Sequence, residues 1–365
     1  MVKIKDITQY LERIAPLSYQ EPYDNCGLLT GDEQQTANGA LVTLDCTEPV
    51  IDEALDNGCN LIIAHHPIWF QPLKSLTGKT YVERTIIKAI KQDVAIYALH
   101  TNLDNIKTGV NLRLAEKLGL SGLEILQTKS TALVKLVTFS PKPNTAEVLR
   151  ALHRAGAGDV GNYRDCSFVT EGTGTFRPNE QAQPHIGKTN QLERVDEDRI
   201  EVILPGFLKH QVLSALFETH PYEEVAYYLQ ELINTNQNIG SGMTGLLETP
   251  MRAEDFLDYV KERIGTPCLR HTELNSATIQ KVGICGGAGS FLTSKALETN
   301  CDAFVTSDIK YHDFFDADGK LLLVDIGHYE SEVATKELVC DIIKKKFSKF
   351  AVRLSTTDTN PIRYL

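Results

Sequence analysis

Short apolar strands that alternate with amphipathic helices constrain the fold of this chain more than any other feature. Apolar runs of strand length occur early in the chain at residues 40–46, 60–64 and 94–99. Helical patterns over 48–57 and 80–92 separate them. Such alternation predicts a mostly parallel sheet covered by helices, and the same order returns after residue 253. We therefore expect an α/β fold with an alternating strand–helix core built in two halves.

Histidines and carboxylates follow the predicted strands where each strand ends. His65 and His66 follow the run at 60–64, and Pro67 then stops strand pairing. Asp104 lies just beyond the strand at 94–99. Ligands of open α/β sheets bind outside the carboxyl ends of the strands, so these side chains can reach one site.

A later strand, residues 321–326, leads through a glycine into His328 and Glu332. These two residues are four apart, the spacing that places side chains on one face of a helix. Three imidazoles and two carboxylates suit zinc, iron(II), manganese or cobalt better than calcium or magnesium. Five ligands suit two metals with a bridging carboxylate. Solvated loop histidines, or histidines in acid–base catalysis, fit the same pattern, so the spacing leaves these alternatives open.

The pattern changes near residue 130, where we predict strand–helix–strand twice, the order of a ferredoxin-like domain. The predicted organisation is a first core half at 1–129, an inserted ferredoxin-like α+β domain at 130–234, and a second core half at 235–365. Within the insert, His220 and Glu224 are spaced like a ligand pair, but Pro221 disrupts a helix there, so we expect a structural role.

Two turns carry glycine and are predicted to be structural. Residues 23–29 contain Asp-Asn and Gly, which mark a turn. Residues 285–290 are glycine-rich but lack the Gly-Lys-Ser/Thr of a phosphate-binding loop, so a tight structural turn is favoured over a phosphate site.

Composition indicates which cellular compartment and which classes of binding partner to expect. The net charge of −11 and the absence of a basic stripe argue against nucleic acid. No apolar run approaches the roughly 20 residues of a membrane span, and residues 1–6 do not look like a signal peptide. The eight cysteines are scattered without close pairs, which fits the reducing cytoplasm.

Several motifs resemble those of the Nif-three-like dinuclear metal centre family, often catalogued as GTP cyclohydrolase 1 type 2 homologs. The core motifs are residues 23–29, 64–67, 100–104, 286–290, 308–313 and 327–332. Long members carry a PII-like or CutA-like insert, which residues 156–158, 161–163, 166–168, 172–176 and 220–224 resemble. One departure is Ser307, where the family usually has glycine.

The resemblance implies that two divalent ions per chain are bound and that the chain forms a homohexamer with itself. The implied ligands are His65, His66, Asp104, His328 and Glu332. We expect a metal-dependent, cyclohydrolase-like hydrolase of a small, possibly nucleotide-like substrate, with His100 or His312 shuttling protons or orienting ligands. The alternative is a non-enzymatic metal-binding or regulatory protein whose insert binds an effector or partner. An open coordination position facing a pocket would favour the hydrolase.

Overall fold

The computed structural model describes residues 1–129, 133–234, 236–274 and 278–365. The chain divides into two compact units, one formed by Met1–Thr128 with Asn238–Leu365 and the other by Lys129–Gln237. We call the first unit the core and the second the insert, and describe each separately.

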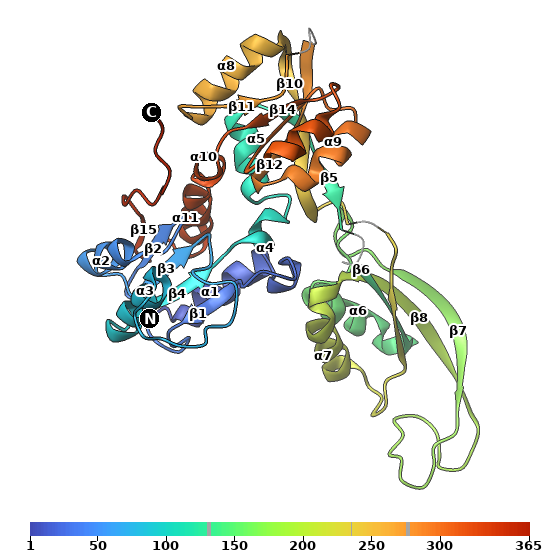
Figure 1. The fold of residues 1–365 in the computed structure, drawn as a ribbon. Coiled ribbons are helices and arrows are strands. Elements are labelled where there is room, and N and C mark those ends of the chain that lie inside the picture. The colour runs from blue at the N-terminus through green and yellow to red at the C-terminus, as the bar shows by residue number, and fades with distance from the viewer. Residues whose placement is uncertain (130–132, 235, 275–277) are drawn as a thin grey trace. The chain divides into compact units, whose positions relative to one another are not determined.

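The first sheet of the core has the strand order β1-β4-β3-β2-β15 (Figure 1). Its strands are β1 (Gly27–Thr30), β2 (Ala40–Thr43), β3 (Leu61–Ala64), β4 (Ala95–Ala98) and β15 (Val352–Leu354). The last four are parallel, and β1 is antiparallel to β4. The helices that follow them are α2 (Glu48–Asp56), α3 (Tyr81–Lys91), α4 (Thr101–Asp104) and α5 (Val110–Lys117).

Helices cover both faces of this sheet, which explains why its central strands are continuously apolar. Alternate side chains point to opposite faces. Ile62 packs in one buried cluster with Val50 and Ile51 of α2. Its neighbour Ile63 packs in another cluster that includes α1 (Ile4–Ile14) and α11 (Thr335–Lys346).

The second sheet of the core has the order β11-β14-β13-β12-β10-β5. Its strands are β5 (Ser121–Thr128), β10 (Gly240–Arg252), β11 (Arg270–His271), β12 (Thr278–Ala288), β13 (Ala303–Ser307) and β14 (Leu322–Asp325). Strands β12, β13 and β14 are parallel, and the other pairings are antiparallel. The accompanying helices are α8 (Ala253–Ile264), α9 (Thr293–Glu298) and α10 (His328–Glu332).

The alternating α/β pattern is confirmed. The mostly parallel arrangement holds for the first sheet, whereas the second sheet mixes parallel and antiparallel pairings. The strands form two sheets, and each places antiparallel strands at an edge. The order of strands in the sequence also does not follow the division into sheets. The early strand β5 joins the second sheet, and β15, near the end of the sequence, joins the first by pairing Val352 with Ala40. Local periodicity identifies strands but carries no information about such long-range pairing.

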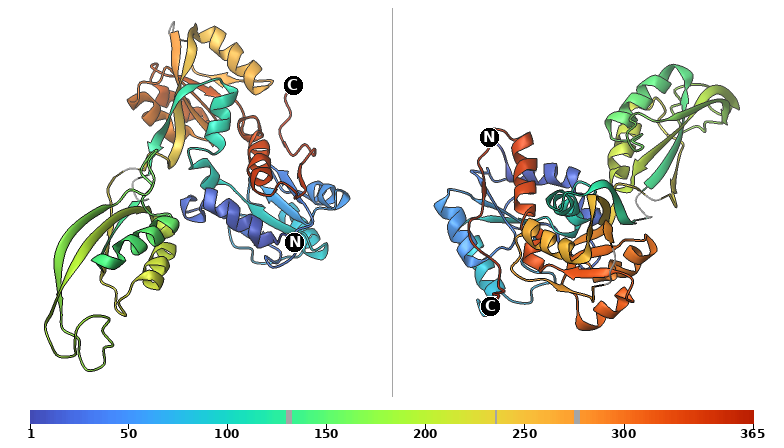
Figure 2. Two further views of the ribbon diagram at one scale, coloured as in Figure 1. Left: turned by 180° about the vertical axis from the view of Figure 1, so that it is seen from behind. Right: turned by 90° about the horizontal axis from the view of Figure 1, so that it is seen from above.

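The insert has the element order β6, α6, β7, β8, α7, β9 and the antiparallel sheet order β7-β8-β6-β9. The bounds are β6 (Leu133–Pro141), α6 (Thr145–Arg154), β7 (Phe168–Phe176), β8 (Glu193–Pro205), α7 (Lys209–Thr219) and β9 (Tyr227–Glu231). Both helices lie on one face of the sheet (Figure 2), where Leu136, Val148 and Leu216 are buried in one cluster. A long hairpin loop, residues 177–192, joins β7 to β8.

Short 3₁₀ helices complete the described structure. They are η1 (Leu17–Tyr19), η2 (Lys142–Asn144), η3 (Gly206–Leu208), η4 (Ser290–Leu292) and η5 (Tyr311–Ala317). Within the described ranges, every helix is too short or too polar to cross a lipid bilayer.

Candidate metal centre

The two histidines at the end of β3 are held with their Nε2 atoms available. Backbone pairing continues past the strand, because His65 N–H donates to Thr43 O at 3.1 Å. His65 is buried, and its Nδ1 lies 2.7 Å from Leu99 O. His66 Nδ1 lies 2.7 Å from Asp45 Oδ1. Each acceptor requires a proton on Nδ1, so Nε2 is left to bind a metal, the usual arrangement of metal-binding histidines.

His328 is oriented in the same way from the second sheet. It begins α10 just after β14, and Gly327 makes the sharp turn between them with φ of 86°. His328 Nδ1 lies 2.7 Å from Asp308 Oδ2, which fixes the ring and directs Nε2 away from that carboxylate. Glu332 ends the same short helix, one turn later.

These side chains converge on one carboxylate oxygen. Glu332 Oε2 lies 2.8 Å from His66 Nε2, 3.0 Å from His328 Nε2 and 3.7 Å from His65 Nε2. Asp104 joins from α4, with its Oδ1 3.7 Å from His65 Nε2. The residues named as ligands in the sequence analysis thus lie together, at the ends of strands from both sheets.

The described residues contain three groups that could hold a metal ion. They are His66, His328 and Glu332; His65, Asp104 and Glu332; and His65, His66 and His100. Two atoms of the cluster, His65 Nε2 and Asp104 Oδ1, are buried and lack a hydrogen-bond partner. A buried polar atom left unpaired costs about 1–3 kcal/mol, and a bound cation would satisfy both of these. The donor set therefore fits a divalent metal.

In the absence of a metal, the carboxylates around the cluster favour the protonated form of His66 and His328. Burial alone would lower the pKa of His66, but hydrogen bonds to Asp45 and Glu332 outweigh it and raise the pKa to about 9. The same balance, with Asp308 and Glu332 as partners, raises the pKa of His328 to about 11. Protons and a divalent cation therefore compete for the same Nε2 atoms.

The pKa values of the two carboxyls in the cluster, the half-buried Asp104 and the buried Glu332, shift in opposite directions. Burial, followed by the charge of Glu332, raises the pKa of Asp104 well above its ordinary value. Burial also acts to raise the pKa of Glu332, but His65, His328 and His66 hold it well below its ordinary value. Glu332 is thus the permanent anion of the site.

His100 approaches the cluster and is oriented by an acid that the sequence analysis overlooked. Its Nδ1 lies 2.8 Å from Oδ1 of Asp24, whose side chain is fully buried. Asp24 also accepts hydrogen bonds from the backbone N–H and the hydroxyl of Thr101. Burial acts to raise the pKa of Asp24, but the bonds to His100 and Thr101 lower it overall. The turn at 23–29, predicted to be only structural, therefore has a part in the site.

Two further orienting acids, Asp45 and Asp308, were also missed. Asp308 directly follows β13, and Asp45 lies two residues after β2, so the rule that selected His65 would have found both. Asp45 also accepts a hydrogen bond from the Thr359 hydroxyl at 2.7 Å, which ties a segment after β15 to the site.

The glycine turn after β12 makes room for Glu332. A Cβ at Gly287 would lie 2.4 Å from Glu332 Oε1, and its φ of +64° disfavours other residues. Ser307 Oγ donates to Gly287 O at 2.6 Å. Ser307 is absent from the positive-φ residues, and its neighbour Asp308, with φ of 54°, takes that conformation instead. Serine at this position therefore fits the turn.

A cavity of about 400 Å³ opens beside the cluster. Its lining includes His66, His100, Asp104, His328 and Glu332. Exposed aromatic side chains also line it, namely Tyr23, Phe70, Tyr81 and Phe291. His312 does not line this cavity. It is exposed on η5, where its ring stacks on Phe315 with 6.4 Å between centroids.

The fold and the site together define an α/β protein with a histidine–carboxylate cluster between the strand ends of two sheets. The chain belongs to the Duf34/NIF3 (NGG1p interacting factor 3) family, whose sequence model matches residues 2–361.

Relatives match along nearly the whole chain. A protein of Halalkalibacterium halodurans named GTP cyclohydrolase 1 type 2 homolog is 41% identical over 365 residues, covering 98% of both chains. The Bacillus subtilis protein of the same name is 37% identical, covering 99% of this chain and 98% of its own. The crystal structure of a Bacillus cereus protein related to NIF3 superposes with a TM-score of 0.88 at 37% identity, covering 100% of this chain and 99% of that one.

Proposed function

We propose that this protein holds two divalent ions and hydrolyses a small substrate in the cavity beside them. The observation that carries the proposal is the position of Glu332 Oε2, which faces His66, His328 and His65 at once. A carboxylate shared by two ligand groups suits a bridge between two metals. His66 and His328 would hold one ion with Glu332, and His65 and Asp104 would hold the other. The donor set suits zinc, iron, manganese or cobalt.

A divalent ion pair supplies Lewis acidity for the hydrolysis of a polarised bond. The protein's own groups would bind the substrate and move protons. Asp24 holds the Nδ1 proton of His100, so His100 Nε2 is the atom that can accept a proton in the cavity. Aromatic side chains such as Tyr23 and Phe291 suit a planar, nucleotide-like substrate. The name of the relatives, GTP cyclohydrolase 1 type 2 homolog, supports this substrate class.

A second candidate is a non-enzymatic metal-binding or regulatory protein. The group of His65, His66 and His100 favours it, because a third imidazole could close a coordination position that a hydrolase keeps open. In this alternative the insert binds an effector or partner. We propose that the insert is a ferredoxin-like domain, which is supported by its β-α-β-β-α-β order.

Assembly and location complete the proposal. We propose a homohexamer, on the basis of the motifs shared with the family. We also propose a cytoplasmic location, supported by eight free cysteines, several of them buried.

The test is elemental analysis of protein purified without added metal, followed by a screen of phosphoester and nucleotide ring-opening substrates. Two ions per chain, with turnover that a chelator removes and added metal restores, would support the hydrolase. Two ions without turnover of any substrate would favour the second candidate. One ion or fewer per chain in freshly purified, unchelated protein would count against the two-ion centre.

A further inference from the structure

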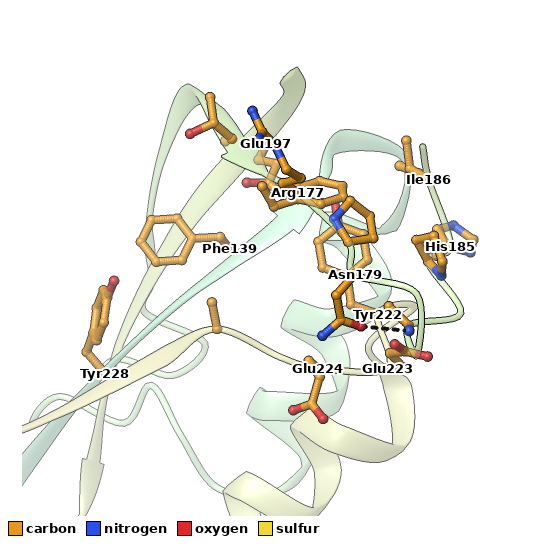
Figure 3. A pocket seen from close by; sticks show the side chains of 17 residues that line it. Phe139, Arg177, Asn179, His185, Ile186, Glu197, Tyr222, Glu223, Glu224 and Tyr228 are labelled. Atoms are coloured by element: carbon orange, nitrogen blue, oxygen red, sulfur yellow. Dashed lines mark hydrogen bonds between the residues drawn. The ribbon is translucent and has the colours of Figure 1, made fainter. Parts of the chain in front are cut away.

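The insert contains a cavity of its own, of about 540 Å³, formed entirely by residues of that unit (Figure 3). This volume lies in the range of about 300–1,000 Å³ that is typical of small-molecule sites. Aromatic side chains from three strands and the segment after α7 line it, namely Phe139, Phe176, Tyr222 and Tyr228. The hairpin loop contributes Arg177 and His185 to the same lining.

A buried carboxylate lies among these aromatic rings. Glu197, on β8, is only 8% exposed and lines the cavity. Its side chain lies across Gly174 of the neighbouring strand, where a Cβ would be 1.9 Å from Glu197 Oε2. One hydrogen bond reaches it, from the Tyr222 hydroxyl to Oε1 at 2.7 Å. Among the described residues, Glu197 forms no ion pair with a lysine, arginine or histidine.

This environment leaves most of the carboxylate's capacity unused. An ionised carboxylate can accept about four hydrogen bonds. The single phenol at Oε1 leaves the other acceptor positions of Glu197 free. Because Glu197 lines the cavity, a donor that enters the cavity can reach Oε2.

Residues 220–224 hold the side chains around Glu197 in position. His220 Nε2 donates to Phe139 O at 2.8 Å, and its Nδ1 accepts the Tyr222 backbone N–H at 3.1 Å. That pair of bonds needs a neutral ring, and burial lowers the pKa of His220 in the same direction. His220 thus positions Tyr222, and Tyr222 in turn holds Glu197. This is the structural role expected for His220.

Glu223 from the same segment fixes the hairpin loop. Both of its carboxylate oxygens lie 3.0 Å from the backbone nitrogen of Gln183. The loop is further shaped by Asn179, whose Oδ1 accepts the N–H groups of Gln181 and Ala182. Hydrogen bonds to Glu223 and Asn179 therefore hold the part of the hairpin loop that forms one wall of the cavity.

We propose that this cavity binds a small molecule that presents two adjacent N–H donors on a planar group. A guanidinium and the N1–H/2-amino edge of a guanine-type base share this chemistry. A planar donor pair can engage a carboxylate with two parallel hydrogen bonds, and its flat face can stack on aromatic rings. The nearby Glu223 and Glu224 favour a cation or a neutral donor over an anion. The proposal is independent of the metal centre.

Calorimetric titration of the full-length protein tests it with two matched probe pairs. Agmatine carries the guanidinium, and 1,4-diaminobutane carries charge without the planar donor pair. Guanosine carries the donor edge, and inosine lacks the 2-amino group. We expect agmatine or guanosine to bind at least about 10-fold more tightly than its matched probe, since about 1.4 kcal/mol corresponds to tenfold. Which of the two binds identifies the source of the donor pair.

Variants then assign the binding to this cavity. Glu197→Gln should weaken binding at least about 10-fold, as expected for the loss of a charge-assisted pair. The matched control Glu231→Gln, an exposed carboxylate on β9 outside the cavity, should leave it unchanged. If Glu197→Gln unfolds the insert, Ala226→Trp serves instead, because it fills the cavity from an exposed lining position and should abolish binding. Failure of both agmatine and guanosine to bind, or binding that survives Glu197→Gln in a folded protein or Ala226→Trp, overturns the proposal.

Discussion

His66 Nε2 and His328 Nε2 lie 3.2 Å apart, although 262 positions separate the two residues in the sequence. Both rings are directed by an acid at Nδ1, Asp45 for one and Asp308 for the other. Two ring nitrogens this close can share a proton, or both can face one bound ion. Here Glu332 Oε2 supplies the anion, and the geometry leaves both nitrogens able to bind one metal.

Glu332→Gln tests this arrangement. The amide keeps the size of the side chain but removes the charge that two adjacent cations need. We expect metal affinity to fall at least about 10-fold at one or both positions, because loss of even an orienting partner typically costs 10–100-fold. Metal stoichiometry and circular dichroism on one sample measure it.

Glu330→Gln is the matched control, since Glu330 lies on the same short helix outside the ligand groups. It should retain full metal content. Unchanged occupancy in Glu332→Gln would remove Glu332 from the ligand set, and a collapsed spectrum would make it a structural residue.

Metal binding should strengthen as the pH rises. The pKa values of about 9 for His66 and about 11 for His328 mean that both rings are cationic near neutral pH. A metal must therefore displace the proton from each Nε2 atom. Titrations between about pH 6 and about pH 9 should show increasing affinity, and buffers of different ionisation enthalpy should reveal proton release. An affinity that stays constant over this range would contradict the assignment.

The stability of the metal-free protein should follow the opposite trend. A histidine whose pKa is raised on folding stabilises the folded state fully below its unfolded pKa of about 6.5, and this contribution is lost as the pH rises through the folded value. For His66 the loss begins near pH 6.5 and is complete above about pH 9. The increase in melting temperature caused by metal should therefore grow with pH.

Asp24→Asn addresses the orientation of His100. An amide can reverse the hydrogen bond to His100 Nδ1 and so select the wrong tautomer. If the protein is a hydrolase, we expect turnover to fall about 10–100-fold while metal content stays near the wild-type level. Asp56→Asn, at an exposed position on α2, is the control. Turnover equal to that of the control would show that His100 needs no such partner.

Removal of the insert tests its modularity. Thr128 and Gly240 are Cα partners in the antiparallel pairing of β5 with β10, so a short linker can join residue 129 to residue 237. We expect a soluble core that binds the same number of ions. Insoluble protein, or soluble protein that has lost its metal, would show that the two units depend on each other.

The strand-end rule accounts for how much of the site could be predicted. A polar residue placed where a strand ends is conspicuous, and this selected His65 and Asp104. The four-residue spacing from His328 added Glu332, and these three side chains do lie together. The division into two sheets could not be predicted, because β5 and β15 find their partners far along the sequence. Local patterns also could not reveal Asp24, whose partner His100 is 76 positions away.

Glu197 shows a different limit. In the sequence it is one acid in the polar run 196–198, and nothing local distinguishes it from its exposed neighbour Asp196. Its burial arises only when Gly174 of the paired strand leaves space for its carboxylate. The register of β7 and β8 depends on the geometry of the hairpin loop between them, which the residues around Glu197 do not reveal.

The hydrogen bond from Thr359 to Asp45 has a consequence for synthesis. Asp45 directs His66, so the orientation of a ligand near the start of the chain depends on a residue near its end. A ribosome makes His65 and His66 first, then the whole insert, and only later His328 and the strand that brings Thr359 into place. Before that moment a nascent chain can offer a metal only a partial set of donors. Loading of the centre is therefore expected to follow synthesis of the segment after β15.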